Sequence, residues 1–152
     1  MSDSQDSAPT AKAIIDANLY MVLGTADPDG VPWVSPVYYA PADYRHFFWV
    51  SRPKATHSRN LERRAEVSIV IFDSSVPIGT GQGVYMKAVA ARLEGDERTT
   101  AIALFSRRSL EHGGAAWTLA DVQPPAQLRL YGATAAEHYV LGPGDRRIEV
   151  NL

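Results

Sequence analysis

The chain is organised around residues 47–61, FFWVSRPKATHSRNL, which run from an apolar strand through a cationic turn into a helix. Four side chains of this stretch can donate to a phosphate: Arg52, Lys54, His57 and Arg59. The hydroxyls of Ser51, Thr56 and Ser58 can cap the helix or bond the same phosphate. A helix N-terminus adds free N–H groups and a positive dipole end. The stretch predicts a phosphate-binding corner; the alternative is an ordinary helix start with a solvated basic face.

Two features of this stretch refine the prediction. His57 lies about one turn into a helix expected over Lys54–Arg64, and it follows Lys54 by three positions. That spacing would place both side chains on one helix face, which favours His57 as a phosphate ligand over a polar surface residue. Trp49 and the pair Tyr38-Tyr39 offer aromatic surface for stacking on a planar ring, although aromatic residues of a small barrel also fill its core.

Composition excludes several classes of function. The chain has 152 residues, 45% of them hydrophobic and 21% charged, and a net charge of -2, so no global basic field favours nucleic acid or anionic membrane. It contains no cysteine, and its four histidines show no paired metal-ligand spacing, so we expect no metal site. We also expect a cytoplasmic protein without membrane contact, because no leader-like or membrane-spanning apolar run is present.

The rest of the chain reads mainly as short strands joined by turns. Helices are expected over residues 9–18, 54–64 and 96–112, and strands over residues 19–25, 31–39, 46–50, 67–72, 84–93, 127–141 and 147–151. Pro32 and Pro36 each remove a ladder donor, which indicates an edge strand or a bulge. Residues 67–72 are nearly all apolar, which predicts a strand covered on both faces. This pattern favours a mainly β protein, a small antiparallel barrel in one domain over residues 9–152 after a flexible tail of residues 1–8.

The ordered set of motifs resembles the pyridoxamine 5′-phosphate oxidase-like, flavin-binding split barrel superfamily. The resemblance spans about residues 10–95 and extends more loosely to the C-terminal hairpin. Its matching elements are Gly24-Thr25, Asp29-Gly30-Val31-Pro32, Ser35-Pro36-Val37, Ser51-Arg52-Pro53-Lys54, Ser58-Arg59-Asn60-Leu61 and Val67-Ser68-Ile69-Val70-Ile71.

This resemblance implies a homodimer of six-stranded split barrels of Greek-key type, with FMN or a deazaflavin in each of two clefts at the dimer interface. Backbone groups of Ser35, Pro36 and Val37 would face the isoalloxazine ring. Trp49, Val50 and Ser51 would border the ring and ribityl chain. The phosphate would be bound by Arg52, Lys54, His57 and Ser58. Gln82 would reach the cofactor held mainly by the other subunit.

Two departures from the true oxidases narrow the expected activity. Pro53 interrupts their contiguous Ser-Arg-Lys triplet, and the chain ends at Leu152 without their longer C-terminal segment. We therefore do not expect vitamin B6 oxidation. The first hypothesis is an FMN-dependent oxidoreductase acting on an unidentified small molecule, with no assigned catalytic side chain. The alternatives are a deazaflavin-dependent reductase, whose longer acidic tail would contact Arg59, Arg63 and Arg64, a non-catalytic flavin- or haem-binding module, and a barrel without a cofactor.

Overall fold

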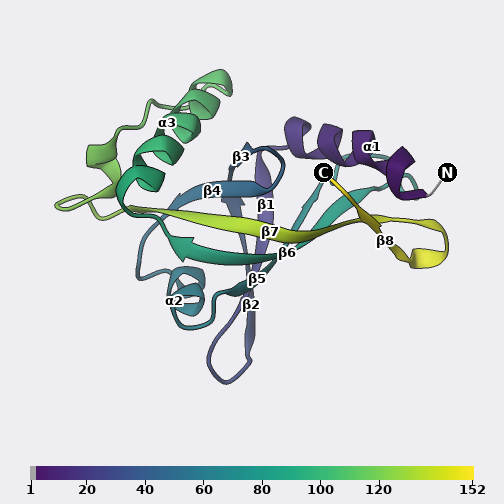
Figure 1. The fold of residues 1–152 in the computed structure, drawn as a ribbon, viewed down its shortest axis with the longest axis horizontal. Coiled ribbons are helices and arrows are strands. Elements are labelled where there is room, and N and C mark those ends of the chain that lie inside the picture. The colour runs from purple at the N-terminus through teal and green to yellow at the C-terminus, as the bar shows by residue number, and fades with distance from the viewer. Residues whose placement is uncertain (1–2) are drawn as a thin grey trace.

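The computed structural model describes residues 3–152, with side chains from residue 7 onward, and in this part of the chain one antiparallel sheet is flanked by helices (Figure 1). The helices are α1 (Asp3–Ala17), α2 (Thr56–Arg63), α3 (Gly95–Glu111), η1 (Leu119–Val122) and η2 (Pro143–Asp145). The strands are β1 (Tyr20–Ala26), β2 (Pro32–Tyr38), β3 (Ala40–Ala42), β4 (His46–Ser51), β5 (Glu66–Phe72), β6 (Gly83–Arg92), β7 (Arg129–Leu141) and β8 (Arg147–Val150). Among the described helices, none combines the length and the hydrophobicity that a transmembrane span needs.

The sheet closes on itself as a split barrel. Its strand order is β2-β1-β5-β6-β7-β4-β3, with β8 paired to β7. β2 and β3 lie at opposite edges of this order, although a single residue, Tyr39, separates their ends in the sequence. Because consecutive Cα atoms are about 3.8 Å apart, the two edges must meet in space. The sheet therefore curls round a core and is split along the seam between β2 and β3, which confirms the predicted mainly β barrel.

The number of strands and the start of the chain differ from the expectation. The sheet has eight strands rather than six, because β3 and β8, of three and four residues, extend it beyond the six longer strands. The first helix begins at Asp3, whereas a flexible tail was expected through residue 8. Ala8 packs against the core, which holds this turn of the helix in place. Residues 1 and 2 of the expected tail lie outside the described residues.

The proline-bearing strand lies where its composition predicts. β2 is an edge strand, so neither Pro32 nor Pro36 interrupts a ladder between two neighbours. It is joined to β1 by a tight turn in which the Asp27 carboxylate accepts hydrogen bonds from the N–H groups of Asp29 and Val31, both at 2.9 Å. Gly30 has φ +86° in this turn, a conformation that favours glycine.

The main core fills the barrel, and two helices cover its ends. Side chains from the inner face of every long strand meet Ala11 and Ile15 of α1 and Leu61 of α2. In β5 the inner residues are buried, but Ser68 is exposed and Val70 is half-buried on the other face. The prediction that this strand is covered on both faces is therefore wrong for the single chain. We call this other face, which carries Val34, Ser68, Lys87 and Val89, the outer face.

Candidate functional site

The corner lies where β4 ends at Ser51 and α2 begins at Thr56, two residues later than the expected start. Pro53 does not extend the helix backward; instead Ala55 N–H donates to the Arg52 carbonyl at 3.1 Å in a turn. The helix N-cap is Ala55, and no described side chain caps the first turn. Alanine is a poor N-cap because it offers no acceptor. The first N–H groups of α2 thus remain available to an anion.

Cations surround this uncapped helix start. The side chains of Arg52, Lys54 and Arg59 are exposed. The side chains of Lys54 and Arg59 form no hydrogen bond or ion pair with the described residues, and Arg52 donates to the Gln127 side-chain oxygen at 2.5 Å. Within this part of the chain no carboxylate neutralises these three charges. The donor set matches a phosphate, which accepts hydrogen bonds and carries negative charge.

The other polar groups of the corner face the barrel. Ser51 follows Phe47 and Trp49 on the inner side of β4, because side chains alternate along a strand. Its Oγ lies 2.9 Å from Nε2 of His57 and accepts from the Ser58 hydroxyl at 3.4 Å. His57 is 8% exposed and Ser58 is fully buried. These hydrogen bonds attach the first turn of α2 to the end of β4.

The structure corrects the relation expected between Lys54 and His57. Lys54 precedes the helix and is exposed, whereas His57 points inward, so the two do not share a helix face. Burial lowers the pKa of the His57 imidazole below its ordinary value. The corner therefore has an outer layer of permanent cations and an inner layer of hydroxyls with a neutral imidazole.

Several partners of the corner come from distant parts of the sequence. Asn60, buried in α2, donates its side-chain amide to the Thr25 hydroxyl of β1 at 3.1 Å. Gln127 binds Arg52, and Arg129 lies opposite Ser51 in the ladder between β4 and β7. The sequence analysis named Thr25 only within a family motif, and it did not select Gln127 or Arg129. The sequence carries no local signal for these contacts, because the sheet topology alone brings these residues to the corner.

The residues expected to border a cofactor ring lie on two strands. Ser35, Pro36 and Val37 belong to edge strand β2, where Ser35 is half-buried and Pro36 exposed. Val50 is half-buried on β4 and packs in a second core beneath α3. Trp49 is fully buried and stacks on Tyr131 with ring centroids 6.1 Å apart. The side chain of Trp49 is therefore closed to a ligand.

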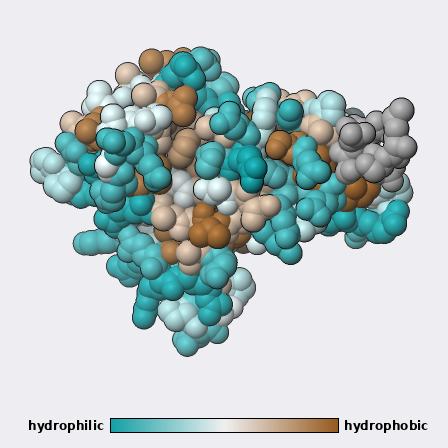
Figure 2. Space-filling model, in the orientation of Figure 1, coloured by the Kyte–Doolittle hydropathy of each residue, from teal (hydrophilic) through white to brown (hydrophobic). Residues whose placement is uncertain are grey.

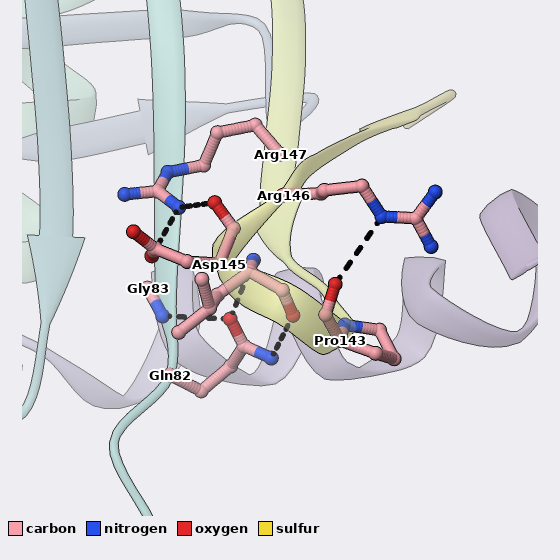
Figure 3. A network of polar contacts seen from close by, with 7 residues as sticks. Gln82, Gly83, Pro143, Asp145, Arg146 and Arg147 are labelled. Carbon is pink, nitrogen blue, oxygen red and sulfur yellow. Dashed lines mark hydrogen bonds and ion pairs between the residues drawn. The ribbon is translucent and has the colours of Figure 1, made fainter.

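Gln82 makes a structural bridge within the chain (Figure 3). Its side-chain oxygen accepts from Gly83 N–H at 2.9 Å and from Leu141 N–H at 2.8 Å, and its amide donates to the Leu141 carbonyl at 3.0 Å. These bonds join the start of β6 to the end of β7. In the hairpin that follows β7, Arg147 pairs with Asp145 at 3.1 Å and lies over the Tyr85 ring. The expected contact of Gln82 with the partner's cofactor stays a prediction.

We expect Gln82→Ala to lower the free energy of unfolding by about 1–3 kcal/mol, because it leaves backbone groups of Gly83 and Leu141 without their partner. Urea denaturation of the variant and of Gln123→Ala measures this. Gln123 is a matched control, since its side chain has no hydrogen bond to the described residues. Equal stability of both variants would show that the bridge contributes nothing.

Three open hollows lie on the outer face. One of about 560 Å³ is lined by Val22, Val34, Val70, Tyr85, Tyr139 and Arg147. A second, of about 630 Å³, shares Val34 and includes Trp33. The third, of about 710 Å³, lies between α3 and the sheet and is lined by Phe48, Val89 and Leu93. Figure 2 shows hydrophobic residues exposed at the middle of the molecule, between α3 and α2.

A family model described as pyridoxamine 5′-phosphate oxidase matches residues 7–141. The chain belongs to this family. The match covers strands β1 to β7 and the candidate corner, and it confirms the resemblance found in the sequence. No curated sequence matches the chain.

Solved structures with the family's fold superpose on most of the chain. A haem-binding protein from Mycobacterium smegmatis is 21% identical with a TM-score of 0.73, over 92% of this chain and 55% of that one. HutZ, the haem storage protein from Vibrio cholerae, is 23% identical with a TM-score of 0.67, over 84% of this chain and 89% of that one. ChuZ from Campylobacter jejuni is 11% identical with a TM-score of 0.76, over 99% and 61%. The chain thus spans little more than half of two of these proteins, and the likeness shows the fold alone.

Proposed function

We propose that this protein binds FMN with its phosphate at the start of α2 and serves as an oxidoreductase for a small molecule. The main support for the proposal is the exposed set of Arg52, Lys54 and Arg59 around the start of α2. The N-cap residue there is Ala55, whose side chain cannot accept a hydrogen bond from the first N–H groups. A capped helix with a solvated basic face, the alternative interpretation of this stretch, would have its first N–H groups satisfied by a side chain. Membership of the pyridoxamine 5′-phosphate oxidase family supports a phosphate-bearing ligand.

The remaining residues would position the ring. Asn60 and Thr25 tie α2 to β1 at the point where Thr25 pairs with Trp33 of β2. Residues Ser35–Val37 start two positions after Trp33, so this part of the β2 edge would lie near the corner. A ring linked to a phosphate bound at the corner would need such a neighbouring surface. A bound flavin supplies hydride transfer, while the protein supplies orientation and electrostatics. We assign no side chain as a general acid or base.

The test of the cofactor is the visible absorption spectrum of the purified protein, followed by heat release and chromatography of any chromophore. We expect either bound FMN or a colourless protein that binds added FMN. Turnover is then tested with reduced nicotinamide and a panel of electron acceptors. Failure to bind FMN, deazaflavin or riboflavin would reject the flavin assignment, whereas binding without turnover would indicate a flavin-binding module.

We also propose that a second copy of the chain covers the outer face. The exposed fractions of Val34, Val89 and Trp33 are 67%, 55% and 51%. These side chains line the hollows and form an apolar surface across the sheet, which is typical of an interaction site. Coverage by a second copy would also explain why residues 67–72 carry apolar side chains on both faces.

We expect Val34→Lys to convert a dimer to a monomer, because it would place an unpaired charge within the covered surface. Light scattering after size-exclusion chromatography should show the dissociation constant of the dimer raised at least about tenfold. Leu110→Lys is the matched control, since Leu110 is 57% exposed on α3 and lines none of the three hollows. A dimer that Val34→Lys leaves intact would place the interface elsewhere.

A deazaflavin is the second candidate cofactor. Arg59 and Arg63 are exposed on α2. Arg64, the exposed residue that follows the helix, donates to the Pro28 carbonyl at 3.2 Å. Such a row of cations suits an acidic tail longer than one phosphate. Competitive titration of FMN against the deazaflavin separates the candidates, and a clear preference for FMN would exclude the second.

Haem is the third candidate, because two solved structures of similar fold are haem proteins by name. His57 and His138 are buried with Nε2 hydrogen-bonded, whereas His46 and His112 are exposed and bonded through Nδ1. An iron ligand would therefore be His46 or His112. Titration with hemin tests this, since a sharp Soret band that disappears in the His46→Ala, His112→Ala variant would support haem.

A further inference from the structure

A chain of hydrogen bonds joins the phosphate corner to a buried imidazole. Ser58 donates to Ser51 Oγ at 3.4 Å, and Ser51 Oγ lies 2.9 Å from His57 Nε2. Ser51 is half-buried at the end of β4 and precedes the exposed Arg52. Ser51 is thus the member of the chain that lies between the buried imidazole and the exposed cations.

The protonation state of His57 depends on its burial and on any ligand bound at the corner. The charged groups on the elements packed around it are as follows. Arg52 and Lys54 precede it, Arg59, Glu62 and Arg63 share its helix, and Arg129 lies opposite Ser51 on β7. From β6, Arg92 pairs with Glu62 at 2.5 Å. The segments of β1 and β2 nearest the Asn60 contact, at Thr25 and Trp33, carry no ionisable side chain. Burial is the cause that lowers the pKa of His57, and a nearby anion would act against it.

A phosphate needs donors, and the hydroxyl of Ser51 has one hydrogen to give. We propose that in the free protein Ser51 donates this hydrogen to His57 Nε2, and that phosphate binding draws one proton from solvent onto the imidazole. Nε2–H then donates to Ser51 Oγ, and the Ser51 hydroxyl turns to the phosphate. The balance is simple: one proton leaves the solvent and is held by His57, and no covalent bond between heavy atoms changes. This inference rests on the proposed FMN site.

The direction of the pH dependence follows from linkage. The bound dianion raises the pKa of His57 from its lowered value, so binding takes up protons and affinity increases as pH falls between the bound and free pKa values. The phosphate of FMN itself accepts a proton near pH 6, by analogy with phosphoserine, so a measurement at about pH 7.5 isolates the protein's contribution. At that pH a histidine with a lowered pKa is neutral before binding.

The test is calorimetric titration of FMN at about pH 7.5 in buffers of different ionisation enthalpy, which counts the protons taken up. We expect a net uptake of protons in the wild type, with one proton per site as its upper limit, and its loss in His57→Gln and in Ser51→Ala. Riboflavin, which lacks the phosphate, should bind without uptake. Arg107→Ala, which removes an exposed side chain of α3 away from the corner, should retain the full uptake.

The outcomes separate the two proposals. FMN that fails to bind the wild type overturns the proposed function, and the inference falls with it. FMN that binds without proton uptake, or with uptake that persists in His57→Gln, overturns this inference and leaves the FMN site intact. Far-UV circular dichroism of each variant establishes that it is folded, and Ser51→Ala gives a second route should His57→Gln unfold.

Discussion

Replacing Arg52 and Lys54 together by alanine is expected to weaken FMN binding by a factor of at least about one hundred. A hydrogen bond between charged groups contributes about 1.5–3 kcal/mol, and each 1.4 kcal/mol is a tenfold change in affinity. Both side chains are exposed beside the start of α2, so solvent screening places them near the lower end of this range. Two such contacts give about 3 kcal/mol.

Quenching of FMN fluorescence measures the dissociation constants. Arg107→Ala is the control, because Arg107 is also exposed but lies on α3, away from the corner. Riboflavin should bind the wild type and the double variant alike, since both replaced side chains would bind only the phosphate. If the double variant bound FMN with unchanged affinity, the assignment of the phosphate to this corner would be wrong. Stability should be nearly unaffected, because among the described residues the two side chains form a single hydrogen bond, from Arg52 to Gln127.

Trp49→Ala should lower the free energy of unfolding by about 3–5 kcal/mol, the largest effect that we expect of any single substitution on stability. Trp49 is fully buried at the centre of the barrel and stacks on Tyr131 at an interplanar angle of 15°. Its loss leaves a cavity beside this ring and removes most of the packing between β4 and β7 at that point.

Trp49→Phe is the matched variant. The indole N–H of Trp49 is buried without a hydrogen-bond partner among the described residues, so its removal breaks no hydrogen bond. We expect Trp49→Phe to cost clearly less than Trp49→Ala in urea denaturation followed by far-UV circular dichroism. Its affinity for FMN should match that of the wild type, because the fully buried side chain of Trp49 is closed to a ligand. A large loss of FMN affinity in a stably folded Trp49→Phe variant would instead show that the Trp49 side chain contributes to FMN binding.

The fold was largely predictable because its signals are local. The turn at Asp27–Gly30, the edge position of β2 and the alternation along β6 each depend on a few neighbouring residues and were found where expected. The short strand β3 was not predicted, since a segment of three residues carries little periodicity. β8 lies within the strand expected over residues 147–151, but it was not counted in the six-stranded barrel that the resemblance implied. The start of α1 at Asp3 was not predicted, and Ala8, which was assigned to the tail, packs against the barrel.

The residue types of the candidate site could be predicted from the sequence, but the directions of their side chains could not. The residue types of the corner indicate an anion, and Arg52, Lys54 and Arg59 are exposed there. The inward direction of His57 and the structural use of Gln82 were not predictable, because each depends on a partner from another element.

The family, the antiparallel barrel and the cationic corner could all be recognised from the order of residues, because motif order, turn chemistry and side-chain type are properties of short segments. The fold was needed to show which groups of the corner face solvent and which face the core. It joined Thr25 to Asn60, Arg52 to Gln127 and Gln82 to Leu141, across 35, 75 and 59 positions of the chain. The physical reason is that burial and hydrogen bonding depend on distance in space, and sheet topology sets that distance independently of separation along the chain.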